Sequence, residues 1–208
     1  MAKTLNMWRQ EGLPAIIQRG LKRLIRPFFE TNSAFWFTRD LSAPLPEISP
    51  RCPVEIDLSS ADETIGWLRN HRERWVFNQR EVEIGLKEKH YFANVKCGGR
   101  IVGYAKVGKN KIYIHDYRKV LAFPRDCVFI YDTYVIPEYR GLRIAPYLVA
   151  QIMSFLKNDG VKRLGCHIPP WNIASMRVYE GLGFTRSKYV RYVKLLGLKV
   201  FTAKPGIA

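Results

Sequence analysis

The sequence predicts an α+β fold, and three observations carry that prediction. Two strand-like runs, 91–97 and 100–107, are joined by Gly98-Gly99, a turn that favours a β-hairpin. An apolar run over 127–136 has the composition of a buried strand. A helical apolar repeat follows it at 146–158, so strand and helix alternate in the second half of the chain.

The other elements are predicted from the same periodicities and from capping signals. The pattern Ser60-x-x-Glu63 is typical of a capping box and predicts the start of a helix. A strand at 111–117 lies between the hairpin and 127–136, which predicts an antiparallel meander. The remaining expected elements are a helix at 78–89 and strands at 163–168 and 185–195.

The N-terminal segment 13–29 predicts a basic amphipathic helix. Its apolar residues recur at helical spacing, and Arg19, Lys22, Arg23 and Arg26 lie on the other side. Such a helix can dock its apolar stripe on the protein's own core or on a second subunit. It can also lie in an anionic membrane interface, with its cations among lipid phosphates. Both interpretations are open from the sequence.

A proline-rich connector separates this helix from the strands. Its prolines are Pro44, Pro46, Pro50 and Pro53. At that density they exclude a helix and favour an extended linker. We therefore expect a boundary near residue 50, with a helical extension and connector in 1–50 and the main domain in 51–208. An aromatic patch ahead of the prolines, Phe35-Trp36-Phe37, indicates a strand or a packing anchor.

Composition excludes several classes of protein. The 208 residues are 47% hydrophobic and 13% aromatic, which favours a packed core over disorder. The four cysteines lack Cys-x-x-Cys spacing, so neither a zinc site nor a disulfide framework is predicted. No apolar run could span a membrane and no secretory signal is visible, so we expect a cytoplasmic protein. The net charge of +16 indicates anionic partners.

The run Tyr-Arg-Gly-Leu-Arg-Ile-Ala at 139–145 is the most informative part of the sequence. It lies between the strand at 127–136 and the helix expected from Pro146. A loop that opens a helix leaves several backbone N–H groups unpaired and directed at one point, with the helix dipole behind them. The segment therefore predicts a binding site for a phosphate or pyrophosphate.

Two motifs around this loop resemble those of the GCN5-related N-acetyltransferase (GNAT) superfamily. Arg140-x-x-Arg143-x-Ala145 resembles the family's acetyl-CoA loop, usually Arg/Gln-x-x-Gly-x-Gly/Ala. Asn172-x-x-Ser175-x-x-x-Tyr179 resembles its second signature. The resemblance implies a GNAT fold, a mixed and mostly antiparallel central sheet flanked by helices. The residues it implies for binding acetyl-CoA, or a longer acyl-CoA, are Tyr134, Val135, Arg140, Gly141, Leu142, Arg143, Ile144, Ala145, Asn172, Ser175 and Tyr179.

One position departs from the family pattern, because Arg143 stands where members usually have Gly. Gly there lets the backbone approach the pyrophosphate without a Cβ in the way. Arg143 can instead direct its guanidinium at the phosphates, or it can mark weakened cofactor binding.

The resemblance also implies a reaction, transfer of acetyl from acetyl-CoA to a primary amine by direct attack in a ternary complex. In the family the strand matching 128–136 splays from its neighbour, here the strand that carries His167. An N–H near Val135 would polarise the thioester carbonyl. Asp132 is the first candidate for the base and His167 the second, while Tyr179 is the candidate acid.

Alternation along the strand at 128–136 supports Asp132 as the base. Strict alternation places Ile130, Asp132 and Tyr134 on one face and Val135 on the other, toward the core. An aspartate inside a strand is disfavoured without a function or a salt bridge. Farther along the chain, Asn172 suits a helix N-cap as well as a cofactor contact.

The sequence leaves the acceptor open. Its pocket would be built from the first two helices and the loops at 72–90 and 117–126, with His115 and Asp116 nearby. A small molecule, lipid or sugar that carries an amine would suit it. The basic surface would suit an acidic acyl carrier protein as donor, and 13–29 would suit the inner face of a membrane.

An alternative function belongs to a different class. A catalytically weak acyl-CoA-fold module could act as a membrane-surface or nucleic-acid binding protein, which Arg143 and the net charge would favour. The nucleic-acid version is less favoured, because no element interleaves basic and aromatic residues.

Overall fold

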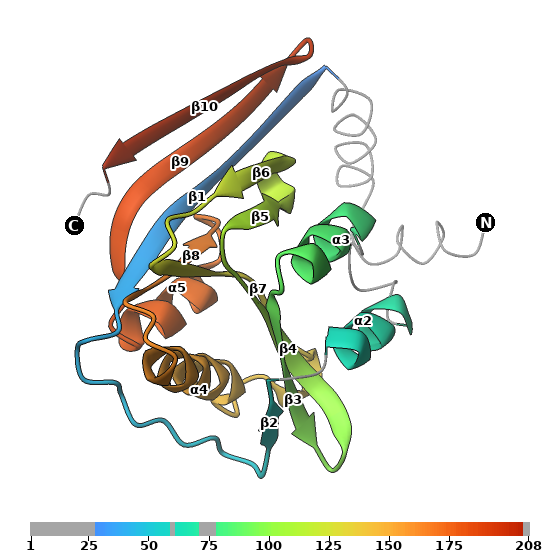
Figure 1. The fold of residues 1–208 in the computed structure, drawn as a ribbon, viewed down its shortest axis with the longest axis vertical. Coiled ribbons are helices and arrows are strands. Elements are labelled where there is room, and N and C mark those ends of the chain that lie inside the picture. Colours follow the sequence, from blue (N-terminus) through green and yellow to red (C-terminus); the bar gives the residue numbers. More distant parts are fainter. Residues whose placement is uncertain (1–27, 59–60, 71–77, 206–208) are drawn as a thin grey trace, which may run out of the picture.

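A computed structural model describes residues 28–58, 61–70 and 78–205 (Figure 1). The chain adopts the predicted α+β fold. Its strands are β1 (Phe29–Asp40), β2 (Glu55–Asp57), β3 (Tyr91–Cys97), β4 (Arg100–Gly108), β5 (Lys111–Ile114), β6 (Lys119–Ala122), β7 (Cys127–Val135), β8 (Arg163–Ile168), β9 (Thr185–Leu195) and β10 (Leu198–Pro205). Its helices are α2 (Ala61–Asn70), α3 (Gln79–Lys87), α4 (Ile144–Asn158) and α5 (Ile173–Gly181), with 3-10 turns η1 (His115–Tyr117) and η2 (Pro137–Tyr139).

Eight strands form one sheet in the order β10-β9-β1-β8-β7-β4-β3-β2, and β5 and β6 form a separate hairpin. Neighbouring strands of the sheet run antiparallel except β7 and β8, which run parallel. The mixed, mostly antiparallel sheet that the resemblance implies is confirmed. The hairpin between β3 and β4 is also confirmed, and Gly98 and Gly99 both have positive φ, at 54° and 75°.

Two layers cover the sheet (Figure 1). Helices α4 and α5 pack on one face over the largest core, where α4 buries residues spaced four apart, such as Leu148, Ile152 and Leu156. A smaller core on the other face joins β5 and η1 to β1, β7 and β9. Helices α2 and α3 meet β3 on that second face, around Phe92.

Strand β1 lies inside the sheet and determines the position of β8. It pairs with β8 from Phe35↔Ile168 to Asp40↔Arg163, and with β9 along its other edge. The aromatic patch is therefore a strand, as predicted, with Phe37 fully buried. β1 lies before the boundary expected near residue 50. It is nevertheless hydrogen-bonded to β8 and β9, which lie after that boundary. No helix or strand is assigned between 41 and 54, in agreement with the prolines there.

Several predicted elements are corrected. The strand expected at 111–117 ends at Ile114, because the next three residues form η1, and it pairs with β6 outside the meander. Strands β2, β6 and β10 lack a sequence prediction, and β10 has no fully buried residue that would mark a buried face. The helix expected at 13–29 does not include Phe28 and Phe29, because Phe28 lies in a turn and Phe29 begins β1. The rest of that helix, 13–27, lies outside the described residues.

A glycine in β4 lets that strand lie close to β7. A Cβ built on Gly103 would lie 2.7 Å from the Tyr134 carbonyl oxygen and 3.3 Å from Val135 Cγ2. Both atoms belong to the end of β7, so Gly103 permits the spacing of the two strands at that point.

We expect Gly103→Ala to lower the free energy of unfolding by roughly 1–3 kcal/mol, because its methyl group must displace the β7 backbone. Gly66→Ala in α2 is the matched control, since nothing lies within 4 Å of its Cβ position. Alanine is favoured over glycine inside a helix by about 1 kcal/mol, so the control should gain stability. Urea denaturation of both variants measures the difference. An unchanged midpoint in Gly103→Ala would contradict the close approach.

Candidate active site

Strands β7 and β8 separate partway along their length. They pair in parallel through four residue pairs, the last of which is Ile130↔Cys166, and no pairing between them continues in the described chain. Beyond that point β7 stays with β4 up to Val135, whereas β8 stays with β1 up to Ile168. Each strand therefore follows a different neighbour, and a gap opens in the sheet.

The register of β7 against β4 turns backbone groups toward this gap. Ile136 N–H donates to the Val102 carbonyl at 2.9 Å, which marks their pair as hydrogen-bonded. Hydrogen-bonded and non-hydrogen-bonded pairs alternate along an antiparallel ladder. The N–H groups of Thr133 and Val135 therefore point away from β4 and into the gap, where they can bind a ligand.

A β-bulge at Tyr131 changes the alternation that the sequence predicts. Ile130 and Asp132 face consecutive residues of β4, so Tyr131 between them has no partner there. Ile130 is consequently buried in the same core as Val135. The prediction that Ile130 shares a face with Asp132 is wrong for this reason.

The loop after β7 enters α4 through two residues with positive φ. Gly141 has φ 81°, and Arg143, the N-cap residue, has φ 58° and ψ 22°. The first bond of the helix runs from Tyr147 N–H to the Arg143 carbonyl at 3.2 Å. The N–H groups of Ile144 and Ala145 precede that bond, so they are positioned to bind an anion.

Arg140 and Leu142 connect this loop to its surroundings. Arg140 Nε donates to the Val135 carbonyl at 3.1 Å, and its guanidinium carbon lies 5.5 Å from the centroid of the Tyr134 ring. The Leu142 carbonyl accepts from Arg51 N–H at 2.8 Å. The proline-rich connector, which contains Arg51, therefore holds the loop through a backbone hydrogen bond.

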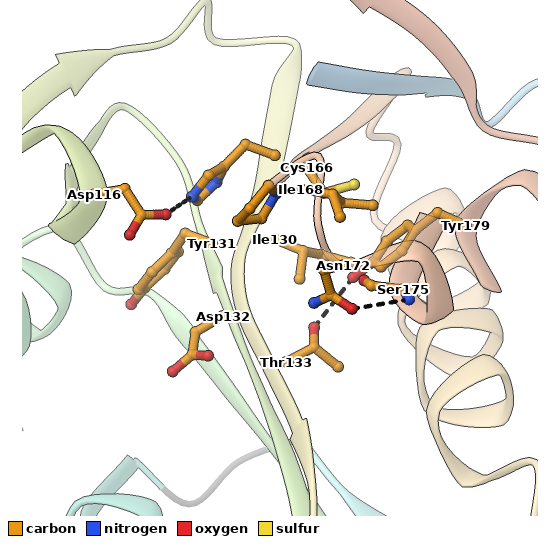
Figure 2. Close-up of a pocket in the computed structure, with 12 residues that line it drawn as sticks. Asp116, Ile130, Tyr131, Asp132, Thr133, Cys166, Ile168, Asn172, Ser175 and Tyr179 are labelled. Atoms are coloured by element: carbon orange, nitrogen blue, oxygen red, sulfur yellow. Dashed lines mark hydrogen bonds and ion pairs between the residues drawn. The ribbon is translucent and has the colours of Figure 1, made fainter. Parts of the chain in front are cut away.

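A pocket occupies the gap between β7 and β8. Figure 2 shows Asp116, Tyr131 and Asp132 on one side of it, and Asn172, Ser175 and Tyr179 on the other. The remaining lining residues are Ile130, Thr133, Cys166, His167, Ile168 and Pro169. Because polar groups line both sides, two reactants could meet here from opposite directions.

The Asp132 carboxylate is held by two residues of β4. Its Oδ2 accepts from the Tyr104 hydroxyl at 2.7 Å and lies 3.1 Å from Lys106 Nζ. Lys106 is buried and also lies 2.6 Å from Glu81 Oε1. Burial lowers the pKa of Lys106, but the charges of Asp132 and Glu81 outweigh it and raise the pKa above its ordinary value. The ammonium therefore stays charged and orients the carboxylate.

Tyr179 and Thr133 meet on the other side of the pocket. Their hydroxyl oxygens are 3.1 Å apart. Burial raises the pKa of Tyr179 well above its ordinary value, so its hydroxyl keeps its proton at neutral pH. Asn172 Oδ1 accepts from Ser175 N–H at 3.2 Å and caps α5, which confirms the predicted N-cap.

His167 is bound to Asp116 within the pocket. Its Nε2 lies 3.3 Å from Asp116 Oδ2, and its ring stacks on Phe129 with centroids 5.8 Å apart. Its Nδ1 is buried and has no hydrogen-bond partner among the described residues. The hydrogen bond from His167 lowers the pKa of Asp116. The pair therefore presents the Asp116 carboxylate, more than the imidazole, to the pocket.

The structure brings most of the predicted site residues together. Asp132, His167, Asn172, Ser175 and Tyr179 line one pocket, and the loop at 140–145 follows directly from β7. His115 is different, because its Nδ1 lies 3.3 Å from Asn78 Nδ2 and it does not line the pocket. In the expected acceptor loop at 72–90, residues 72–77 lie outside the described residues.

Sequence reasoning missed Glu81, Tyr104, Lys106, Tyr131 and Thr133. Lys106 had a signal, since it interrupts the apolar strand Val-Gly-Tyr-Ala-Lys-Val-Gly. Glu81 had none, because it follows two other polar residues in α3. No group of three or more His, Cys, Asp or Glu in the described ranges could hold a metal ion.

Lys106→Met should lower the free energy of unfolding by about 3–5 kcal/mol, because it leaves the Glu81 carboxylate buried without its partner. Glu81→Leu combined with Lys106→Met should recover most of the loss, since a packed apolar pair can replace a buried ion pair. Urea denaturation of the single and double variants measures both effects. Equal loss in the two would show that Glu81 and Lys106 are not energetically coupled.

Arg143→Gly should raise the free energy of unfolding by up to about 1 kcal/mol, because a left-handed backbone costs a residue with a Cβ. Arg143→Ala keeps that cost and removes only the guanidinium, so it should stay close to the unchanged protein. Thermal unfolding of the two variants separates backbone from side chain. The same shift in both would rule out a conformational origin.

Solved structures with the same fold come from diverse organisms. A GCN5-related N-acetyltransferase from Sphaerobacter thermophilus has a TM-score of 0.56 at 17% identity, covering 90% of this chain and 57% of its own. A Drosophila protein has a TM-score of 0.53 at 12% identity, covering 89% of this chain and 58% of its own. This chain therefore spans just over half the length of either protein.

A third similar structure matches over nearly its whole length. The ribosomal-protein-S18-alanine N-acetyltransferase of Escherichia coli has a TM-score of 0.52 at 13% identity, covering 70% of this chain and 96% of its own. At such identities the likeness shows the fold alone.

The sequence itself also matches a known family. No curated protein matches the chain at a significant level. The profile of the acetyltransferase (GNAT) family matches residues 54–184, which include the gap between β7 and β8, the loop before α4, and α5. The chain therefore belongs to the acetyltransferase (GNAT) family.

Proposed function

We propose that this protein transfers the acetyl group of acetyl-CoA to a primary amine of an acceptor, by direct attack in a ternary complex. The observation that carries the proposal is the gap between β7 and β8, which lies next to the loop that opens α4. Backbone donors, a buried phenol and carboxylates all meet in this gap.

The residues present fit acetyl-CoA, the cofactor of the family. The N–H groups of Ile144 and Ala145 at the start of α4 suit a pyrophosphate, and Arg143 adds positive charge beside them. The Val135 N–H, which is nearer to that loop, suits an amide oxygen of the pantetheine arm. A longer acyl-CoA, or an acyl carrier protein with the same arm, would use the same donors.

The acidic side of the pocket supports an amine as the acceptor. Asp116 and Asp132 line it, and Glu81 lies behind Asp132 on the far side of Lys106. Glu81 and Asp132 both contact Lys106, and Asp116 contacts His167, so the carboxylates here outnumber the lysine inside a protein whose net charge is +16. A protonated amine is attracted to such a site, whereas an anionic acceptor is repelled.

Each pocket residue has a role in this proposal. Acetyl-CoA, when bound, supplies an acetyl group activated as a thioester. Thr133 N–H, two residues farther from the loop and beside Tyr179, polarises its carbonyl oxygen. Asp132 accepts a proton from the amine, directly or through one water, as the N–C bond forms. Tyr179 donates its phenolic proton to the departing sulfur as the C–S bond breaks.

Asp132 suits the base role better than His167 does. Within the described part of the chain, both contacts of its carboxylate fall on Oδ2, so Oδ1 can still accept a proton. His167 has Nε2 engaged by Asp116 and Nδ1 buried. We assign His167 a positioning role through Asp116, with the base role as the alternative that kinetics can test.

The cofactor part of the proposal is tested by calorimetric titration of the full chain with acetyl-CoA, desulfo-CoA and a long-chain acyl-CoA. Acetyl-CoA should bind with one-to-one stoichiometry. Arg140→Ala should weaken that binding, because the loop loses its bond to the Val135 carbonyl. Absence of binding to all three ligands would contradict the proposal and favour a catalytically weak binding module.

The chemical roles are tested by single variants in an amine-acceptor screen. Asp132→Asn should lower kcat by about 10²–10⁴-fold with the KM for acetyl-CoA nearly unchanged. Tyr179→Phe should lower kcat without altering the pH at which the base must lose its proton. If His167→Gln produces the large loss and Asp132→Asn does not, the base is His167.

A further inference from the structure

An apolar surface lies where the β9–β10 hairpin meets the start of β1, at one extreme of the molecule (Figure 1). Leu196 N–H donates to the Phe28 carbonyl at 2.7 Å. The register places Leu195 opposite both Phe29 and Leu198. These five residues, Phe28, Phe29, Leu195, Leu196 and Leu198, are called the hairpin end below. Leu196 is 75% exposed, Leu198 74% and Phe28 60%.

The apolar character continues along one face of the strands. Val193 pairs with Val200, two residues farther from the turn, and Val200 is also exposed. None of the hairpin-end residues belongs to a hydrophobic core formed by the described residues. Scattered exposed leucines are common on proteins, but a contiguous group at one extreme indicates a contact surface.

Charge within β9 and β10 has one sign, and Glu30 of β1, which lies opposite Lys194, is buried and contacts Arg118. From residue 181 to the C-terminus the chain has six Lys and Arg and no Asp or Glu. Lys194 and Lys199 lie beside the turn and face each other across β9 and β10. Together with Arg191 and Lys204, they form no ion pair with any residue in the described ranges. The surface therefore combines exposed leucine and phenylalanine with uncompensated cations.

The preceding part of the chain has the same chemistry. Phe28 is the first described residue, so the segment predicted as a basic amphipathic helix is joined to the hairpin end directly. Residues 12–27 include four Lys and Arg and no Asp or Glu. The sequence that leads into the hairpin end is thus basic and apolar as well.

A second copy of this chain fits the surface poorly. The edge strand β10 could pair with another β10, but its lysines would then lie near the partner's, with no carboxylate in either strand. The phosphates of a nucleic acid would bind the lysines, but they would offer no apolar partner for the exposed leucines. A bilayer with anionic headgroups satisfies both, because the acyl boundary takes the apolar side chains and the phosphates take the lysines.

We propose that the hairpin end is a docking surface for an anionic lipid bilayer. Phe28, Leu196 and Leu198 enter the headgroup–acyl boundary, and Lys194 and Lys199 contact lipid phosphates. The active-site gap lies elsewhere in the sheet, between β7 and β8, so docking leaves it open. This surface does not depend on the proposed reaction.

The test is flotation of the full chain with vesicles of phosphatidylglycerol and phosphatidylcholine in equal parts, and with phosphatidylcholine alone. The protein should float with the anionic vesicles and be released by raised salt. Leu196→Asn combined with Leu198→Ser should lower its partition by roughly tenfold or more. Lys194→Gln combined with Lys199→Gln should lower it by about tenfold, with the loss confined to anionic vesicles.

The leucine variant is chosen so that the fold is retained. Leu196 and Gly197 have φ of 47° and 90°, so an Asn-Gly pair suits this two-residue turn better than Leu-Gly does. Leu86→Ser is the matched control, because Leu86 lies on α3 and is 50% exposed. Acetyl-CoA titration of all the variants checks that the rest of the molecule is intact.

Two results would overturn the proposal. In the first, the leucine variant floats as well as the unchanged protein, or Leu86→Ser loses as much. In the second, light scattering shows that the unchanged protein is a dimer and that the leucine variant is a monomer, which would mean that a second copy covers the surface.

Discussion

The separation of β7 from β8 is the constraint on which the rest of this structure depends. β8 follows β1 through Ile168, and β7 follows β4 through Val135. Closing the gap would break one of these ladders, at about 1 kcal/mol for each backbone hydrogen bond lost. The gap therefore results from the strand pairing itself, and it leaves the Thr133 and Val135 N–H groups of β7 without a partner strand. Gly103 contributes by letting β4 approach the end of β7.

The candidate active-site pocket is lined by acidic side chains, although the net charge of the protein is +16. Lys106 is buried between Glu81 and Asp132, although an apolar pair of similar size would be at least as stable there. We infer that Lys106 and Glu81 serve to orient the Asp132 carboxylate. Asp116, bound to His167, adds a second carboxylate to the same side of the pocket. A strongly basic protein thus lines this pocket with carboxylates.

Much of the fold and part of the site could be predicted from the sequence. Strands at 163–168 and 185–195 agree with β8 and β9 in both bounds, because buried periodicity and flanking turns mark them. β10 could not be predicted, since it is exposed almost throughout. The bulge at Tyr131 could not either, because a bulge depends on pairing with β4 and leaves no local signal. The contacts of Lys106 with Glu81 and of His167 with Asp116 join residues far apart in sequence, and only the fold brings them together.

The most direct test of the central claim is amide hydrogen exchange measured by mass spectrometry, with and without acetyl-CoA. If the gap and the start of α4 hold the cofactor, exchange should slow in peptides covering 131–136 and 141–147. Exchange in β3, which lies on the far side of β4, should stay the same. Protection of β3 and no change at 131–136 would contradict the account and place the cofactor elsewhere.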